Sequence, residues 1–159
     1  MKKVLIALGG LSVAGALAAF PAQVAAHGGN PHDEAKAMAA AMKKPVVVRG
    51  AAKLTIIHVQ RGCHVWSTGK RQAEGAKVFL RRGQTLTVLN QDLDVHRLVH
   101  LSGPKAALGP ALMMNQRTTV RFTKAGVYRL RTQTSEMPGM PEMKTTGPDN
   151  LLPIVVVVT

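Results

Sequence analysis

A series of short apolar runs, which begins at Val46 and continues to the C-terminus, limits the possible folds of this chain most. The runs are rich in Val, Ile, Leu and Thr, and Gly, Pro, Asn or basic residues separate them. Short runs of this composition between turn-forming residues are typical of β-strands. Strands are therefore expected at 46–49, 53–60, 76–80, 85–90, 96–101, 117–123, 126–132 and 152–158.

Apolar and polar side chains alternate in several of these runs. Leu86 and Val88, for example, alternate with Thr85 and Thr87, which indicates strands with one buried and one wet face. Turn signals recur about every 8 to 12 residues, and no stretch between the strands has the length or period of a crossover helix. We therefore expect an all-β fold, an antiparallel Greek-key β-sandwich, preceded by a short N-terminal helix or arm.

The first 26 residues have the composition of a secretory signal peptide. Lys2 and Lys3 form the charged start, an apolar run follows from residue 4 to 20, and small side chains precede a cleavage point after Ala26. An uncleaved membrane anchor is the alternative, but the run is shorter than the ~20 residues that span a bilayer. We expect an exported, periplasmic protein with no membrane span after cleavage, and its 133 remaining residues suffice for one domain.

Residues 27–44 differ in composition from both neighbours. Gly, Asn, Pro and His come first, and an Ala-rich stretch with acids at its N-terminal end follows and ends at Pro45. Such a stretch favours a short helix or a partly ordered arm. The expected organisation is a signal peptide at 1–26, this arm at 27–44 and one domain at 45–159.

The charge of the chain favours anionic partners. Only Lys2 and Lys3 of the 21 basic residues, and none of the 8 acidic residues, precede the cleavage point, so the remainder carries a formal net charge of +11. Acidic proteins or phospholipid head groups fit this charge. Nucleic acid does not fit, because three Phe, one Trp and one Tyr offer few stacking platforms in an exported protein.

Cys63 is the only cysteine of the chain, so it has no internal disulfide partner. A lone thiol in an oxidising compartment is a liability unless it is buried or bound to a metal. Both a small buried side chain and a metal ligand remain open for Cys63 on this ground alone.

Two segments carry a resemblance to a known family. The segment NQDLDVHRLVH places Asn90 at the end of one expected strand and His96 at the start of the next, and FTKAGVYRLRT forms a later strand pair. Here the chain resembles the cupredoxins, over roughly 54–159. The resemblance implies a copper-binding sandwich in which His96 is a ligand of the copper.

The chain departs from the usual cupredoxin pattern at the ligand cysteine. Arg131, Thr132 and Gln133 stand where a Cys would follow the Gly-x-Tyr strand. The segments GCHVWS and GPDNLL are similar to those of a branch of cupredoxin-like domains, which implies that Cys63 supplies the thiolate at the same end of the sandwich as His96. Because neighbouring strand residues face opposite sides, His64 joins Cys63 as a ligand only if the segment is a bent loop.

A methionine is expected to complete the site. Met143 is the first choice, with Met140 and Met137 as alternatives in the same Pro-containing loop, and Met113 and Met114 in the preceding loop. Thiolate, imidazole and a weak thioether together suit both Cu(I) and Cu(II). Structural zinc sites usually close with four Cys or His ligands, so copper is the expected cofactor.

A second copper position is expected at the new N-terminus, where the α-amine and imidazole of His27 could chelate Cu(II) together with His32. A disordered arm whose histidines bind nothing is the alternative. His58 and His100 are interpreted as ordinary strand residues.

Three functions follow from these residues. The first is one-electron transfer through a Cys/His/Met copper site, and the second is periplasmic copper handling, that is, buffering, delivery or resistance. The third is a metal-free sandwich that serves as an interaction domain. An enzyme is not expected, because no nucleophile elbow, phosphate loop or HExxH is present in the sequence.

Overall fold

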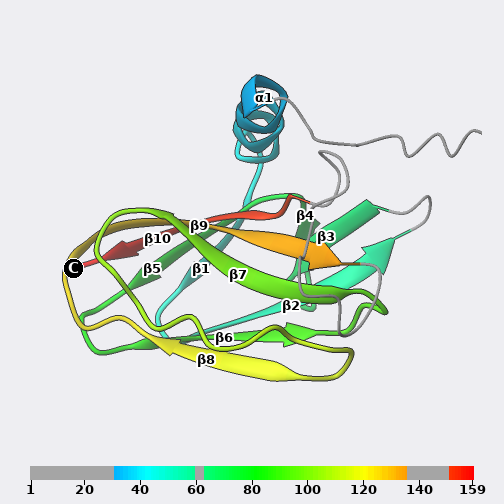
Figure 1. Ribbon diagram of the computed structural model, residues 1–159. Helices are drawn as coiled ribbons and strands as arrows, with labels where there is room; N and C mark the ends of the chain where they lie inside the picture. The colour runs from blue at the N-terminus through cyan, green and yellow to red at the C-terminus, as the bar shows by residue number, and fades with distance from the viewer. Residues whose placement is uncertain (1–30, 60–62, 136–150) are drawn as a thin grey trace, which may run out of the picture.

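The computed structural model describes residues 31–59, 63–135 and 151–159. These residues form a β-sandwich of two five-stranded sheets, with one helix outside it (Figure 1). In spatial order, the first sheet contains β1 (Val46–Arg49), β5 (Ala76–Leu80), β10 (Pro153–Val158), β9 (Gly126–Ser135) and β7 (Val95–Ser102). The second sheet contains β4 (Gln72–Ala73), β3 (Cys63–Ser67), β2 (Ala52–Val59), β6 (Thr85–Asn90) and β8 (Arg117–Arg121).

The expected β-sandwich is confirmed, but the expectation of purely antiparallel sheets is wrong. The pairs β1–β5, β5–β10 and β2–β6 are parallel, and the other pairs of named strands are antiparallel. Parallel neighbours arise here because the chain crosses between the sheets. It leaves β1 for the second sheet, forms β2, β3 and β4 there, and returns to place β5 beside β1. Strands of the other sheet thus replace the helix that usually connects parallel strands.

The core lies between the two sheets and is mostly aliphatic, with Trp66, Phe122 and Tyr128 as its aromatic members. Every second residue of β6 and β10 is buried, as the alternation of Leu86 and Val88 with threonines predicts. Phe122 and Tyr128 meet edge to face within the core, with ring centroids 4.8 Å apart, a geometry that aromatic pairs favour. The Tyr128 hydroxyl donates a hydrogen bond of 2.7 Å to the carbonyl of Lys124.

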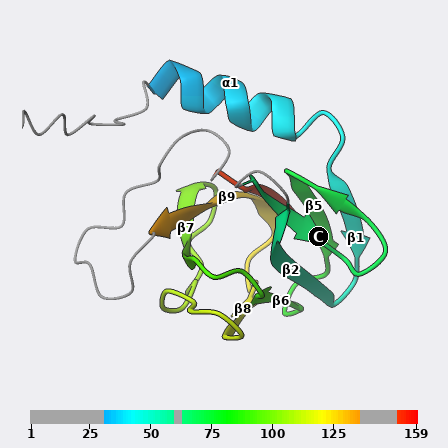
Figure 2. The ribbon, with the colours of Figure 1, turned by 90° about the vertical axis from the view of Figure 1, so that its right-hand side faces the viewer.

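The short N-terminal helix is present as α1 (Pro31–Ala41) and lies outside the sandwich, as Figure 2 shows. Asp33 and Glu34 stand in its first turn, where the helix dipole favours acids. The end of the helix approaches β5 closely, since a Cβ atom added to Gly75 would lie 2.6 Å from the carbonyl oxygen of Ala41. Within the described residues no helix combines the length and apolar character needed to cross a membrane.

Two strands, β3 and β4, were not predicted from the sequence. The prediction has no strand between residues 60 and 76, yet Val65 and Trp66 of β3 pair with Ile57 and Ile56 of β2. The local sequence of β3 does not predict a strand, because its inward positions hold a histidine and a tryptophan rather than aliphatic residues. Pairing with β2, which is rich in β-branched residues, stabilises the strand.

Truncation of the core on the second sheet is expected to destabilise the fold. Leu86 is fully buried, so Leu86→Ala should lower the free energy of unfolding by about 2 to 5 kcal/mol. Leu101→Ala, at a position that is 40% exposed, should cost less than about 0.5 kcal/mol. Urea denaturation of both variants measures the difference, and equal costs would contradict the placement of the core.

Candidate metal centre

Polar side chains from both sheets meet at one end of the sandwich. β2, β6 and β9 run to this end, on the right in Figure 1, and β7 begins there. The register of the strands places the residues: His58 lies opposite His64, and His96 lies opposite Thr134. The second sheet therefore supplies His58 and His64, and the first sheet supplies His96.

Asn90 holds the loop between β6 and β7 in place. Its Nδ2 donates to the carbonyls of Asp94 at 2.7 Å and Leu112 at 2.9 Å, and its Oδ1 accepts from the backbone N–H of Asp92 at 2.9 Å. Asn90 is fully buried, so these bonds satisfy groups that water does not reach. They turn the chain so that the Asp92 side chain enters the sandwich.

The carboxylate of Asp92 is the centre of the cluster and is fully buried. Its Oδ2 lies 2.8 Å from Nε2 of both His64 and His96, and its Oδ1 accepts from the backbone N–H of Leu93 at 2.6 Å. A buried carboxylate is costly unless it is paired and hydrogen-bonded. The two histidines and the Leu93 N–H provide that compensation.

Both ring nitrogens of His96 have partners. Nε2 is hydrogen-bonded to Asp92, and Nδ1 lies 3.2 Å from the hydroxyl oxygen of Thr134. A neutral ring that donates from Nε2 to the carboxylate and accepts at Nδ1 satisfies both contacts. His96 is 1% exposed, so its orientation is fixed by these two bonds.

His64 is equally buried, at 2% exposure, but its bonding differs. Neither of its ring nitrogens has a hydrogen-bond partner within the part of the chain that the structure describes. Nε2 approaches Asp92 to 2.8 Å and Oδ2 of Asp94 to 3.4 Å, without the alignment of a hydrogen bond. A buried imidazole whose nitrogens make no hydrogen bonds is costly even beside a carboxylate, and a metal ion would satisfy it.

His58 brings a third imidazole to the cluster from the solvent side. Its side chain is 48% exposed, and its Nδ1 lies 3.5 Å from Oδ1 of Asp92. The ring centroids of His58 and His64 are 5.4 Å apart, and those of His64 and His96 are 5.0 Å apart. The three imidazoles thus form a row from the surface to the interior.

The environment shifts two pKa values. Burial lowers the pKa of His96, the Asp92 hydrogen bond opposes this shift, and the charge of His64 adds to it, so the result lies below the ordinary value. Burial alone would raise the pKa of Asp92, but the His96 hydrogen bond, the charges of His64 and His96 and the Leu93 N–H outweigh burial and lower it. His96 is therefore held neutral and Asp92 charged, the forms in which both residues bind metals.

The donor set fits a metal ion. Donor atoms of His58, His64 and Asp92 all lie within 4.8 Å of one another. Imidazole nitrogen and carboxylate oxygen are ligands of copper and zinc. The two His64 ring nitrogens, which have no hydrogen-bond partner among the described residues, also favour a metal ion, independently of the distances.

The structure brings some predicted site residues together and leaves others untested. His64 and His96 lie side by side. Cys63 belongs to the paired strand β3, opposite Val59, rather than to a bent loop, and its side chain lies outside the described part. His27, Met137, Met140 and Met143 lie outside the described residues, and His32 is placed only as a residue of α1. Met113 and Met114 are each 49% exposed.

Two residues of the cluster were missed by the sequence analysis. Asp92 lies within the segment NQDLDVHRLVH, but no role was predicted for it, and His58 was interpreted as an ordinary strand residue. A signal for His58 exists, because it stands two residues after the buried Ile56 and therefore faces the same side of β2. Its proximity to Asp92 depends on the pairing of β2 with β3 and β6, which the sequence does not reveal.

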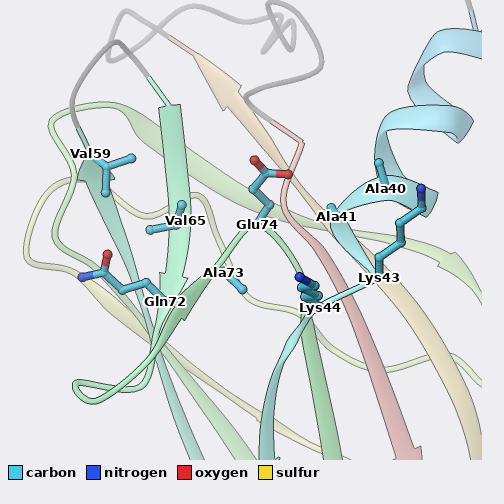
Figure 3. Close-up of a pocket in the computed structure, with 9 residues that line it drawn as sticks. All are labelled: Ala40, Ala41, Lys43, Lys44, Val59, Val65, Gln72, Ala73 and Glu74. Atoms are coloured by element: carbon cyan, nitrogen blue, oxygen red, sulfur yellow. The ribbon is translucent and has the colours of Figure 1, made fainter.

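A separate hollow of about 710 Å³ lies between the end of α1 and the outer face of the β2–β3–β4 edge (Figure 3). Val59 and Val65 line it from the sheet, opposite Lys43 and Lys44 of the segment after α1. These valines follow His58 and His64 by one position, so they face the other side of the strands. The hollow is thus not part of the histidine cluster.

Comparison with known proteins gives structural neighbours only. No protein-family model matches the chain, and no curated protein matches it. A purple cupredoxin from Nitrosopumilus maritimus is 16% identical, with 68% of this chain and 99% of that one covered and a TM-score of 0.41. An oxidised mutant of amicyanin is 20% identical, with coverages of 69% and 82% and a TM-score of 0.42.

A copper-containing nitrite reductase from Thermus scotoductus SA-01 is 14% identical, with a TM-score of 0.37; 73% of this chain but 22% of the reductase is covered. The solved structures to which the chain is similar thus include a cupredoxin. The β-sandwich itself is established by the strand pairing described above.

The stability of the metal-free protein should depend on pH through His96. Its folded-state pKa lies below the ordinary value of 6.5, so between these two values the unfolded chain binds a proton that the folded chain does not. The free energy of unfolding should therefore fall as the pH drops below 6.5. Urea denaturation between about pH 7.5 and about pH 5.5 measures this fall, which should be smaller in His96→Gln. An identical fall in both proteins would contradict the assignment.

Removal of the Asn90 side chain should destabilise the loop that carries Asp92. Asn90→Ala leaves the Asp94 carbonyl and the Asp92 N–H without their Asn90 partner and removes one of the two hydrogen bonds to the Leu112 carbonyl, so we expect a loss of about 2 to 4 kcal/mol in the free energy of unfolding. Gln91→Ala, at the exposed neighbouring position, serves as control and should change it by less than about 0.5 kcal/mol. Chemical denaturation of the metal-free variants tests the difference, and similar values would show that Asn90 does not hold the loop.

Proposed function

We propose that this protein is an exported copper-binding protein of the cupredoxin type, which transfers single electrons. The observation that carries the proposal is His64, a buried imidazole whose nitrogens lack hydrogen-bond partners among the described residues, 2.8 Å from Asp92 and next to His96. Bound copper would supply one-electron chemistry between Cu(I) and Cu(II). His96 and His64 are the proposed nitrogen ligands, with Met143 or Met140 as thioether. Cys63 is the proposed thiolate, which requires the first residue of β3 to depart from the strand alternation, because a regular strand would turn Cys63 and His64 to opposite faces.

The residues around the site have separate tasks in this proposal. Asn90 fixes the loop, and Thr134 fixes the ring of His96 through Nδ1. Asp92 keeps a negative charge beside the imidazoles and so favours a cation. Ligands held on the ends of paired strands keep their positions better than ligands on free loops.

The outer face of the first sheet suits an acidic partner protein. None of its five strands contains Asp or Glu. Arg97 and Arg129 are exposed, and Lys77 is half-buried. Lys77 and Arg129 flank Val155 from the two neighbouring strands, so they lie in one row across the sheet. Glu34 of α1 pairs with Arg131 of β9, and the remaining basic side chains favour encounter with acidic redox or copper-trafficking proteins.

Copper handling is the second candidate function. His58, which is 48% exposed, opens the cluster to solvent, and a site that solvent reaches can exchange its metal. His27 and His32 would add Cu(II) positions, and the loop methionines would add Cu(I) positions, because soft thioethers suit Cu(I). More than one copper per chain is expected in this case.

A visible absorption titration with Cu(II), on protein that begins at His27, separates these functions. Electron transfer predicts an intense band that saturates near one equivalent, and that is absent in Cys63→Ala because a sulfur-to-copper transition produces it. A weak band that persists in Cys63→Ala would instead favour copper handling through histidines. His64→Gln should abolish saturable binding at the cluster, and the matched variant His100→Gln should not, since His100 contacts the Pro104 carbonyl away from the cluster. Absence of any copper binding would overturn the proposal and leave the interaction domain.

A further inference from the structure

We propose that His58, His64 and Asp92 form a divalent-metal position of their own at the rim of the sandwich, which takes Cu(II) without the Cys63 thiolate. The inference rests on the proposed function in one respect: His64 is a ligand both here and in the proposed copper site. It differs in its ligands, which are two nitrogens and one oxygen, and in its contact with solvent.

The distances suit direct coordination. Ligand atoms at about 2.0 to 2.1 Å from a tetrahedral or tetragonal ion lie about 2.9 to 3.4 Å from one another. Nε2 of His64 is 2.8 Å from Oδ2 of Asp92, Nδ1 of His58 is 3.5 Å from Oδ1 of the same carboxylate, and the three donors lie within 4.8 Å of one another. Binding of one ion by all three therefore requires the donors to move closer together, which the 48% exposed His58 side chain is free to do.

Hydrogen bonding explains why His64, rather than His96, is a ligand of the rim position. Both nitrogens of His96 are engaged, by Asp92 and Thr134, so coordination by His96 requires the loss of a hydrogen bond. His64 has no such bond to lose among the described residues. His96 instead donates to the carboxylate and holds it in place, as the partners of metal ligands commonly do.

The backbone holds the three donors before any ion binds. His58 and His64 lie directly opposite each other on the antiparallel strands β2 and β3, where side chains of one face are neighbours. Asp92 is fixed through its own N–H to Asn90 and through Oδ1 to the Leu93 N–H. Three prearranged donors lower the entropic cost of binding.

The chemistry of the group indicates which ions it takes. Imidazole and carboxylate suit Cu(II) and Zn(II), whereas Cu(I) prefers sulfur. Three protein ligands leave further coordination positions to water or to an exchanging ligand. Since His58 is half-exposed, an ion can reach this position from solvent without passing through the core.

The test uses the full chain with Cys63→Ala, so that a thiolate cannot contribute, and Zn(II) as a redox-silent probe in isothermal titration calorimetry. In this background, His58→Asn should weaken binding at the cluster at least about tenfold. His100→Asn is the matched control and should leave the affinity unchanged. The N-terminal histidines are the same in all three proteins, so they do not affect the comparison.

A spectroscopic readout complements the calorimetry. Electron paramagnetic resonance of Cu(II) bound to the Cys63→Ala protein should show coupling to two imidazole nitrogens, and His58→Asn should remove one of them. Equal zinc affinities and equal nitrogen coupling in His58→Asn and His100→Asn would overturn the rim position. Loss of all binding in Cys63→Ala would overturn it as well.

The outcomes separate this inference from the proposed function. Suppose that the wild-type protein shows a Cys63-dependent absorption band and that His58→Asn leaves the zinc affinity unchanged. This result would support the proposed copper site and refute the rim position. Zinc and Cu(II) binding that depends on His58, together with no Cys63-dependent band, would support the rim position and refute the thiolate copper site.

Discussion

The shared contact of the Asp92 carboxylate with His64 and His96 is the interaction on which this end of the sandwich depends. His64 belongs to the second sheet and His96 to the first, so the 2.8 Å contacts connect both sheets through one buried group. Removing one partner from a buried charged cluster typically costs about 3 to 5 kcal/mol. Such a cluster is a poor means of gaining stability, because well-packed apolar side chains would serve as well or better. Its presence in an otherwise apolar core therefore requires a chemical reason, and metal binding provides one.

The strand arrangement explains why these residues can meet. Chain crossings between the sheets place β6 beside β2 and bring the β6–β7 loop to the open end of the core. Asn90 then satisfies three backbone groups of that loop and of the neighbouring segment at Leu112. The cluster is thus held by paired strands on two sides and by a hydrogen-bonded turn on the third. A rigid environment of this kind suits a site whose ligands must keep their positions when its metal changes charge.

The sequence predicted the sandwich well because alternation is a local property. The strands at 76–80 and 85–90 were predicted with the observed bounds, and Leu86 and Val88 face inward as expected. β3 was missed because His64 occupies an inward position that usually holds an aliphatic residue. In the site, the Asn90 turn and the position of His96 could be inferred from local motifs. The participation of His58 and Asp92 could not, because it depends on strand register between segments more than 30 residues apart in the chain.

The central claim is that a metal ion binds beside His64 and Asp92. The most direct measurement is an anomalous difference map, recorded at the copper absorption edge, from crystals of the copper-loaded protein. We predict a peak within bonding distance of a His64 ring nitrogen, at the end of the sandwich where the two sheets contribute histidines. Copper density confined to the N-terminal histidines, with His64 still unligated, would contradict the claim.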